Sequence, residues 1–263
     1  MKITVIGSGN IGSALVTGLL RESSTPVGDI TMTDISQEML APFAKQGVSV
    51  MQNNVEATKN ADMVLICVKP YLVDSVIREI LPELTEATLL VSLAAGVDFF
   101  RLQKLTDRLS LPLFRAIPNT AMSVCQSMTC IAASENATQA QCKIALDFFS
   151  LTGRAMLTTE NLMNSATVLA SCGTAFALRY MRAAMEAGVE AGFKPNVSQE
   201  IVAQTMLGAA LLVAESGNHP EVEIDKVTTP AGITIKGLNE MEHAGFSSSV
   251  MKGIIAALVK CNS

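Results

Sequence analysis

Short apolar runs alternate with stretches of helical periodicity from residue 1 to about residue 157. Between the runs, apolar positions recur at helical spacing, as in Ala14, Leu15 and Leu19. Strands that alternate with helices form a parallel sheet with helices on both faces, so the pattern predicts an α/β fold with an N-terminal, Rossmann-type doubly wound sheet. The predicted strands are Lys2–Ile6, Ile30–Thr33, Val48–Met51, Ala61–Val68, Thr88–Ser92, Leu113–Ile117, Met128–Ala132 and Arg154–Leu157.

The pattern changes near Glu160, after which every apolar stretch has helical length. The first helix predicted after this change, Leu162–Ala191, is apolar on more than one face, which is typical of a helix buried on several sides. One nucleotide domain cannot cover so much apolar surface, so we expect an all-α dimerisation domain completed by a second subunit. The predicted domains are residues 1–158 and 159–263. The predicted helices are Leu162–Ala191, Val197–Ser216, one after Pro230, and Ser247–Lys260.

Composition limits the partners and the compartment. The net charge of −5 argues against nucleic acid, and 49% hydrophobic against 16% charged residues favours a subunit interface. We expect no apolar run to reach the roughly 18 residues of a membrane span, and Met1-Lys2 leads directly into a strand instead of a signal peptide. Six cysteines without a C-x-x-C pair, and only two histidines, argue against a metal site or a disulfide framework and favour a reducing cytoplasm.

A glycine-rich loop joins the first strand to the first helix. It has the sequence Gly7-Ser8-Gly9-Asn10-Ile11-Gly12. Gly7 suits a tight turn, Gly9 the close approach of a pyrophosphate, and Gly12 the packing of helix on strand. The pattern alone is weak, but its place between a strand and a helix is the context that predicts a dinucleotide site.

Two further positions are candidates for cofactor contacts. Asp34 ends the second strand, where an acid binds the ribose hydroxyls of NAD, and no arginine follows to bind the 2′-phosphate of NADP. The alternative is that Asp34 and Ser36 cap the next helix. Lys69 follows a buried strand, whose carboxyl end faces the cofactor crevice; the alternative is a solvated surface lysine. Small residues at Ala94-Ala95 would let a flat ring lie against the backbone.

The stretch Val227–Glu240 suggests an anion site. It begins with hydroxyl residues and Pro230, followed by two small residues and a helical pattern. Amides at a helix N-terminus that carry no bulky side chains bind anions readily, and Thr234 would add a hydroxyl beside them. The alternative is an ordinary capped surface helix.

Over essentially its whole length the chain resembles pyrroline-5-carboxylate reductase. The motifs that carry the resemblance are Gly7–Gly12, Val68-Lys69-Pro70, Ser92–Val97, Ile117-Pro118-Asn119-Thr120 and Val227–Glu240. Three positions depart from the family pattern: Ala231 replaces a glycine, and Ala121 and Thr174 each replace a proline.

The resemblance implies reduction of 1-pyrroline-5-carboxylate to L-proline, the last step of proline biosynthesis, with NADPH or NADH, so that both cofactors are expected to be accepted. It also implies a homodimer, in some members five dimers in a ring. Besides the glycine loop, it places Asp34, Ser36 and Asn54 near the adenosine ribose. It places Cys67, Val68, Lys69, Pro70, Leu93, Ala94 and Ala95 near the nicotinamide. It assigns the substrate to Asn119, Gly232, Ile233 and Thr234, with Thr234 as the catalytic residue.

Two other functions remain open from the sequence. A β-hydroxyacid dehydrogenase shares the same plan but needs a lysine base on the first long helix, and Ser171–Arg179 contains none. A non-catalytic, NADPH-sensing dimer would keep the glycine loop but has no need of Pro230–Thr234. The histidines, His219 and His243, lie in contexts typical of capping or surface residues.

Overall fold

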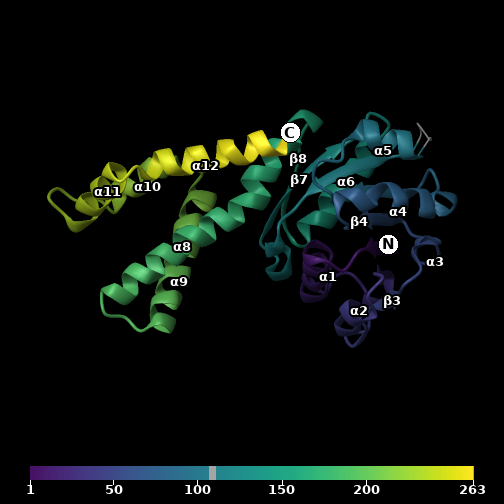
Figure 1. Cartoon of the computed structure of the whole chain (residues 1–263), viewed down its shortest axis with the longest axis horizontal. Helices are drawn as coiled ribbons and strands as arrows, with labels where there is room; N and C mark the ends of the chain where they lie inside the picture. The colour runs from purple at the N-terminus through teal and green to yellow at the C-terminus, as the bar shows by residue number, and fades with distance from the viewer. Residues whose placement is uncertain (107–110, 263) are drawn as a thin grey trace. The chain divides into compact units, whose positions relative to one another are not determined.

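The computed structural model describes residues 1–106 and 111–262. Its contacts divide the chain into two compact units (Figure 1). One unit is Met1–Cys172 with the C-terminal residues from Lys260, and the other is Gly173–Val259. In the described chain the first unit holds all the strands, whereas the second is built from helices. The boundary predicted after residue 158 stays a prediction.

The first unit is organised around an eight-stranded sheet with the order β3-β2-β1-β4-β5-β6-β7-β8. Neighbouring strands are parallel except β6 and β7. The order of the first six strands is that of the doubly wound dinucleotide-binding fold. The strands are β1 (Ile3–Ile6), β2 (Ile30–Thr33), β3 (Ser49–Met51), β4 (Met63–Ile66), β5 (Leu89–Ser92), β6 (Leu113–Ile117), β7 (Ser127–Ala133) and β8 (Gly153–Leu157). The predicted Rossmann-type sheet is therefore confirmed.

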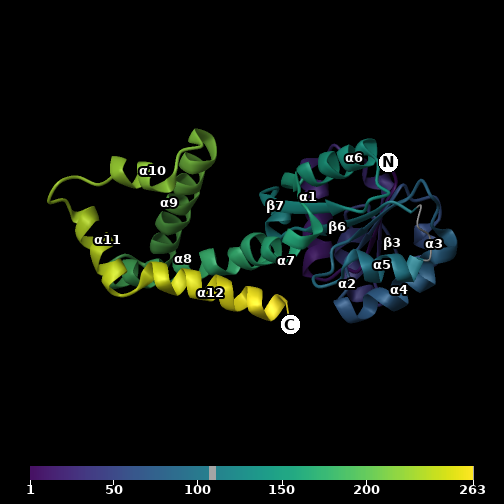
Figure 2. The ribbon, with the colours of Figure 1, turned by 90° about the horizontal axis from the view of Figure 1, so that it is seen from above.

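Helices cover both faces of this sheet, with α1 and α6 on one side and α4 and α5 on the other (Figure 2). One apolar cluster includes Leu15 from α1 and Phe149 from α6; the other includes Ile77 from α4 and Leu102 from α5. Each such buried side chain contributes about 1.5–3 kcal/mol. The helices are α1 (Asn10–Glu22), α2 (Gln37–Ala44), α3 (Asn54–Thr58), α4 (Val73–Ile80), α5 (Phe99–Thr106) and α6 (Gln139–Ser150).

The segment after β8 is helical without a gap from Glu160 to Glu190, close to the predicted Leu162–Ala191, but it includes a π-helical turn. The Asn119 amide nitrogen donates to the Ala170 carbonyl oxygen in this segment at 2.9 Å. Ala170 lies within a π-helical turn, a feature that recurs at functional sites. The successive pieces are a 3₁₀ turn (Glu160–Leu162), α7 (Met163–Ala166), the π-helical turn (Thr167–Cys172) and α8 (Gly173–Glu190).

The second unit is entirely helical in the described chain, which confirms the predicted change of pattern. Its helices α8 and α9 are joined where the Ser198 hydroxyl donates to the Met185 carbonyl oxygen at 2.8 Å. The rings of Tyr180 and Phe246 meet edge to face, with centroids 6.2 Å apart. Of the described residues in these helices only Ser198 is buried. The helices after α8 are α9 (Pro195–Ser216), α10 (Pro220–Lys226), α11 (Ile233–His243) and α12 (Phe246–Cys261).

Helix α9 has the length and composition of a membrane span. An 18-residue window within it has a mean hydropathy of at least 1.2, and 6% of that window is buried in the single chain. Helices α11 and α12 meet the criterion together but are bent by 49° at the break between them. In the described residues the expectation that no apolar run reaches this length was therefore wrong. Core helices of soluble bundles meet the same criterion, so meeting it is only weak evidence for a membrane-spanning helix.

Candidate active site

The glycine loop turns tightly between β1 and α1. Gly7 has φ +106°, and its N–H donates to the Thr33 carbonyl oxygen at 2.8 Å. A Cβ on Gly12 would overlap the Gly7 carbonyl oxygen, so the loop can rest against α1 only because Gly12 has no side chain. By contrast, a Cβ on Gly9 would have no neighbour within 4 Å. Gly9 therefore faces open space, as the close approach of a ligand requires.

The start of α1 fits an anion. Gly9 is the N-cap residue, and no side chain of the described residues caps the helix by accepting a hydrogen bond from its first-turn amides. The first turn, which begins with Asn10 and Ile11, holds no acidic residue. Uncapped amides at a helix N-terminus carry a partial positive charge. The loop and helix together fit the pyrophosphate of a dinucleotide, which is what the sequence predicted for Gly7–Gly12.

Asp34 is fixed at the carboxyl end of β2 by three hydrogen bonds. Its Oδ2 accepts from the amide and hydroxyl of Ser8 at 2.8 and 2.7 Å, and its Oδ1 accepts from the Ser36 amide at 2.9 Å. Partial burial alone would raise the pKa of Asp34, but the bonds from Ser36, Ser8 and the Ile35 amide outweigh it and hold that pKa below its ordinary value. Asp34 is therefore a charged carboxylate at neutral pH.

The two roles proposed for Asp34 and Ser36 separate in the structure. Ser36 is the N-cap of α2, with its hydroxyl accepting from the Met39 amide at 3.4 Å. Asp34 instead links β2 to the glycine loop through Ser8. Next to it, the Thr33 hydroxyl donates to the Asn54 Oδ1 at 2.6 Å, which places Asn54 beside the end of β2. These residues are thus brought together at one edge of the sheet.

The residues assigned to the nicotinamide lie at the same edge. Cys67–Pro70 follow β4, and the Cys67 amide donates to the Ile6 carbonyl oxygen at 2.8 Å. Leu93–Ala95 follow β5, where the Leu93 amide donates to the Ile66 carbonyl oxygen at 3.0 Å. Lys69 is exposed, and burial raises the pKa of the Cys67 thiol to about 12. Cys67 therefore stays uncharged at neutral pH.

Two ionic contacts hold the loops that carry these residues, and sequence reasoning missed both. The Arg101 guanidinium pairs with Asp74 at 2.6 Å and donates to the Pro70 carbonyl oxygen at 3.3 Å. One oxygen of Glu160 accepts from the Phe99 amide at 2.6 Å and from buried Arg115 at 3.0 Å. No sequence pattern could indicate these pairs, because the partners are separated by 27 to 61 positions.

Asn119 is buried, and its amide is used within the first unit. Its Oδ1 accepts from the Ala121 amide at 2.9 Å, and its nitrogen donates to the Ala170 carbonyl oxygen. The bond from Ala121 exists because the residue is not the proline of the family pattern, since proline has no N–H. Asn119 thus joins the turn after β6 to the π-helical turn, and its contact with substrate stays a prediction.

The stretch around Pro230 folds as a tight turn followed by a helix. The Gly232 amide donates to the Thr229 carbonyl oxygen at 2.9 Å, and Ala231 has φ +58°. Proline followed by a residue of positive φ defines a type II turn, in which glycine is the usual second residue. The helix begins at Ile233, three residues later than Pro230, because Ala231 is not helical.

The start of α11 is open in the described chain. Gly232 is its N-cap, no side chain caps it, and no acidic residue lies in its first turn. The Ile233 side chain is 90% exposed, and the hydroxyl of the half-buried Thr234 has no hydrogen bond to another described residue. These features fit an anion-binding helix N-terminus better than an ordinary capped helix. The roles of Gly232, Ile233 and Thr234 stay predictions.

The histidines occupy capping and surface positions, as expected. His219 caps α10 by accepting from the Glu221 amide at 3.3 Å, and exposed His243 lies 3.6 Å from Glu240. Within residues 1–106 and 111–262 no three His, Cys, Asp or Glu side chains cluster as potential metal ligands.

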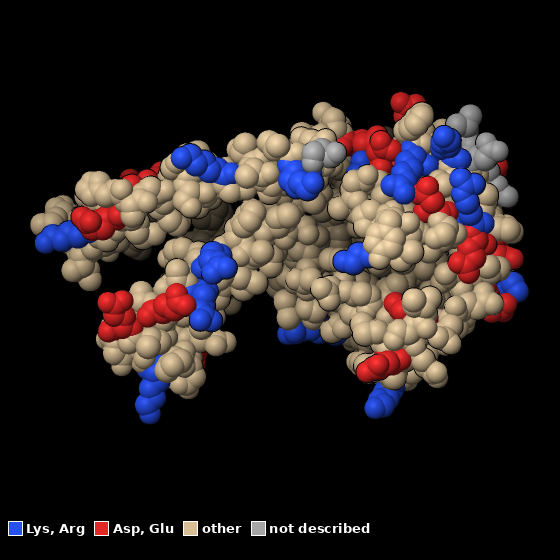
Figure 3. All heavy atoms as spheres, viewed as in Figure 1, with Lys and Arg blue, Asp and Glu red and all other residues tan. Residues whose placement is uncertain are grey.

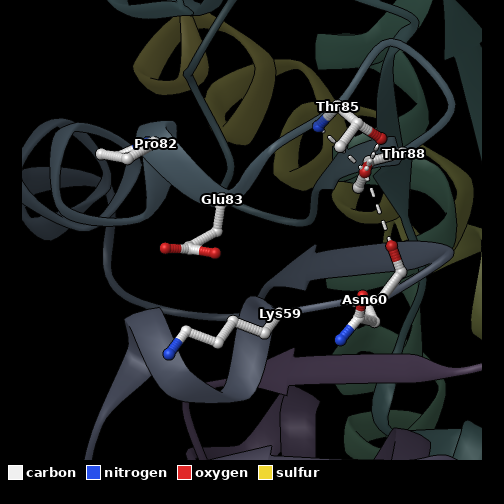
Figure 4. Close-up of a pocket in the computed structure, with 7 residues that line it drawn as sticks. Lys59, Asn60, Pro82, Glu83, Thr85 and Thr88 are labelled. Atoms are coloured by element: carbon white, nitrogen blue, oxygen red, sulfur yellow. Dashed lines mark hydrogen bonds between the residues drawn. The ribbon is translucent and has the colours of Figure 1, made fainter.

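A cavity of about 360 Å³ lies at the opposite edge of the sheet, before β4 and β5 (Figure 4). Thr85 and Thr88 hydroxyls bond to each other at 3.0 Å, and Thr88 donates to the Ala61 carbonyl oxygen at 3.5 Å. The ammonium of Lys59 pairs with Glu56 at 2.7 Å. Ligands of open α/β sheets bind at the carboxyl ends of the strands, so this cavity is not part of the candidate site.

Comparisons with known proteins match both parts of the chain. Residues 160–263 match the family model "Pyrroline-5-carboxylate reductase dimerisation", and residues 2–96 match "NADP oxidoreductase coenzyme F420-dependent". Pyrroline-5-carboxylate reductase 1 of Dictyostelium discoideum is 36% identical over 99% of this chain, which spans 49% of that relative's length. Pyrroline-5-carboxylate reductase 2 of the same organism is 35% identical over 98% of this chain and 91% of the relative.

A solved structure agrees with these relatives. The crystal structure of Plasmodium falciparum pyrroline carboxylate reductase with NADP bound superposes with a TM-score of 0.89. That protein is 26% identical to this one, and the match covers 99% of this chain and 97% of the other.

Proposed function

Because the chain belongs to the pyrroline-5-carboxylate reductase family, we propose that it reduces 1-pyrroline-5-carboxylate to L-proline with NADPH or NADH. This is the last step of proline biosynthesis. The observation that carries the proposal is the uncapped N-terminus of α11 behind the Thr229–Gly232 turn. The substrate has one carboxylate, and a helix start with bare amides and no acidic neighbour is suited to hold it.

The chain's own residues bind and orient. The glycine loop holds the dinucleotide, which supplies the hydride when bound, and the amides at Gly232–Thr234 anchor the substrate carboxylate. The hydroxyl of Thr234 is free to form a hydrogen bond to the imine nitrogen and to orient the ring. The reacting carbons must be held about 3–3.5 Å apart. A cyclic imine carries its own proton at neutral pH, so the site requires no strong acid.

We propose that the protein is a homodimer formed through its second unit. Large apolar side chains on α9 are exposed in the single chain, among them Leu207 at 51% and Leu212 at 53%. Figure 3 shows stretches of uncharged surface on this unit between groups of charged residues. Such surface is typical of an obligate interface. Sedimentation at micromolar concentration should show a dimer, and a stable folded monomer would contradict the proposal. A ring of five dimers stays a prediction.

We also propose a cytoplasmic location. All six cysteines are unpaired. A reducing compartment keeps thiols in this form. Fractionation of cells that express the protein at its natural level should recover it with cytosolic markers, and recovery in the membrane fraction would contradict the location.

The two other functions make different predictions. A β-hydroxyacid dehydrogenase needs a lysine on the first long helix, but α8 contains no lysine. A cofactor-sensing protein would bind NADPH or NADH without consuming it. The test is steady-state oxidation of each cofactor with pyrroline-5-carboxylate, and with β-hydroxy acids in the reverse direction. Oxidation that depends on pyrroline-5-carboxylate supports the proposal; cofactor binding without oxidation contradicts it.

A further inference from the structure

Asp34 stands where the adenosine ribose of a dinucleotide would bind, and its position is rigid. Three donors from Ser8 and Ser36 fix both oxygens at 2.7–2.9 Å. An ionised carboxylate has about four acceptor sites, so about one site remains beside these three bonds, and one hydroxyl of a ribose could use it. A fixed acceptor of this kind suits hydroxyl groups, which can donate, and not a phosphate, which only accepts.

The chain segments that carry Asp34 and Asn54 contain no cation to neutralise a phosphate. The stretch from Thr33 to Ala44 has no lysine or arginine, and neither has the stretch from Met51 to Thr58. The side chain next to Asp34 is the apolar Ile35, which is 91% exposed. Its carbonyl oxygen is held by the Gln52 side chain at 2.6 Å, so the backbone at Ile35 is also fixed.

Asn54 has two amide N–H groups, of which one is already used and one remains as a donor for a phosphate. Its Oδ1 accepts from Thr33 and its nitrogen donates to the Glu79 carboxylate at 3.0 Å. Glu79 thus brings a second negative charge near the end of β2. A 2′-phosphate, which carries a charge of about −1.5 to −2 at neutral pH, would meet two carboxylates. Of the described side chains named here, the Ser36 hydroxyl and the second amide N–H of Asn54 remain as donors.

We propose that Asp34 sets the cofactor preference of this chain, and that it binds NADH more tightly than NADPH. The inference rests on the proposed function, since it concerns the cofactor of that reaction. It distinguishes this chain from its relative from Plasmodium falciparum, whose structure has NADP bound. The sequence leaves both cofactors open, whereas the bonds of Asp34, Asn54 and Glu79 favour NADH.

The test is the dissociation constant of each reduced cofactor, measured on the full chain by the fluorescence of the dihydronicotinamide. The protein has no tryptophan, so its own fluorescence overlaps little with that of the cofactor and little energy is transferred to the cofactor. The dissociation constant of NADH should be at least about tenfold lower than that of NADPH. The reason is that NADPH loses a hydrogen bond to the charged Asp34 and its 2′-phosphate is repelled by that carboxylate. Titrations at several salt concentrations should narrow the difference as the charges are screened.

Two variants examine the cause. Asp34→Asn removes the charge and should reduce the preference for NADH severalfold. Ile35→Arg leaves every bond of Asp34 in place and should tighten NADPH binding more than NADH binding. The matched control is Asp29→Asn, which removes one exposed carboxylate from the same unit and should leave the ratio unchanged.

Each result supports or overturns the inference. A wild-type protein that binds NADPH as tightly as NADH, or an Ile35→Arg variant with an unchanged ratio, would overturn it while the proposed function stands. Binding of neither cofactor would overturn the proposed function itself. Because Ile35→Arg keeps the bonds of Asp34, the inference stays testable even where Asp34→Asn fails to fold.

Discussion

Replacing Ala231 by glycine should stabilise the protein. Ala231 is the third residue of the Thr229–Gly232 turn and has φ +58°, a left-handed conformation that costs an L-residue with a Cβ roughly 1–2 kcal/mol. Glycine removes that cost but adds about 0.4–1 kcal/mol of entropy to the unfolded chain. The difference predicts a net gain of about 0.5–1 kcal/mol for Ala231→Gly.

The measurement is thermal unfolding at one fixed protein concentration, because a dimer's Tm depends on concentration. A gain of about 0.5–1 kcal/mol corresponds to an increase of roughly 1–4 °C for a chain of this size. Gly217→Ala is the matched control. Gly217 has φ +67°, and a Cβ there would have no neighbour within 4 Å, so this variant adds the same strain without a clash.

The two variants should shift Tm in opposite directions by similar amounts. A lower Tm for Ala231→Gly would refute the reasoning, because it would mean that the turn does not hold Ala231 in the left-handed region. A loss for Gly217→Ala with no gain for Ala231→Gly would contradict it in the same way. Activity need not follow stability, since strain near a binding site can keep it in its working geometry.

Three further predictions concern the site and its support. Thr234→Ala should lower kcat/KM for pyrroline-5-carboxylate roughly 10- to 150-fold, which corresponds to the loss of one hydrogen bond to a charged group. Thr234→Ser should recover much of the lost kcat/KM, and a Thr234→Val variant with near-normal kcat/KM would refute the prediction. Gly9→Ala should keep the wild-type Tm but weaken NADH binding in fluorescence titration, because its Cβ enters the open space where the cofactor would bind. Gly12→Ala should lower both the Tm and the affinity for NADH, because its Cβ meets the Gly7 backbone; equal effects of the two variants on Tm would contradict this. Glu160→Gln should lower the free energy of unfolding by about 1–3 kcal/mol in denaturant titration, because it leaves Arg115, which is 5% exposed, without a charge partner. The control Asp147→Asn, in an exposed pair, should lower it by at most about 0.5 kcal/mol, and equal losses would refute the role of Glu160.

The strands could be predicted because their signal is local. Each buried strand is a short apolar run, such as Met63–Ile66, and the glycine loop marks where the first one ends. Helices α3, α5 and α10 were not predicted. Pro220 follows the end of α9, yet it stands at the first position of α10, with Glu221 and Glu223 in its first turn. Proline ends one helix and begins another equally well.

The rest of the site depends on contacts between distant positions. That Asp34 bonds Ser8 across 26 positions, and that Asn119 reaches Ala170 across 51, follows from the sheet order and not from any local pattern. The π-helical turn that contains Ala170, within the predicted helix Leu162–Ala191, was likewise not predicted. The strained turn could be found from the sequence only by knowing that the family has glycine where this chain has Ala231.

The central claim is that this chain transfers a hydride from its cofactor to the C=N bond of pyrroline-5-carboxylate. The most direct measurement uses cofactor deuterated at both C4 positions of the dihydronicotinamide, incubated with pyrroline-5-carboxylate and the purified protein, and mass spectrometry of the product. The account predicts L-proline that carries one deuterium at C5, formed in step with cofactor oxidation. Absence of proline, or proline without deuterium at C5, would contradict it.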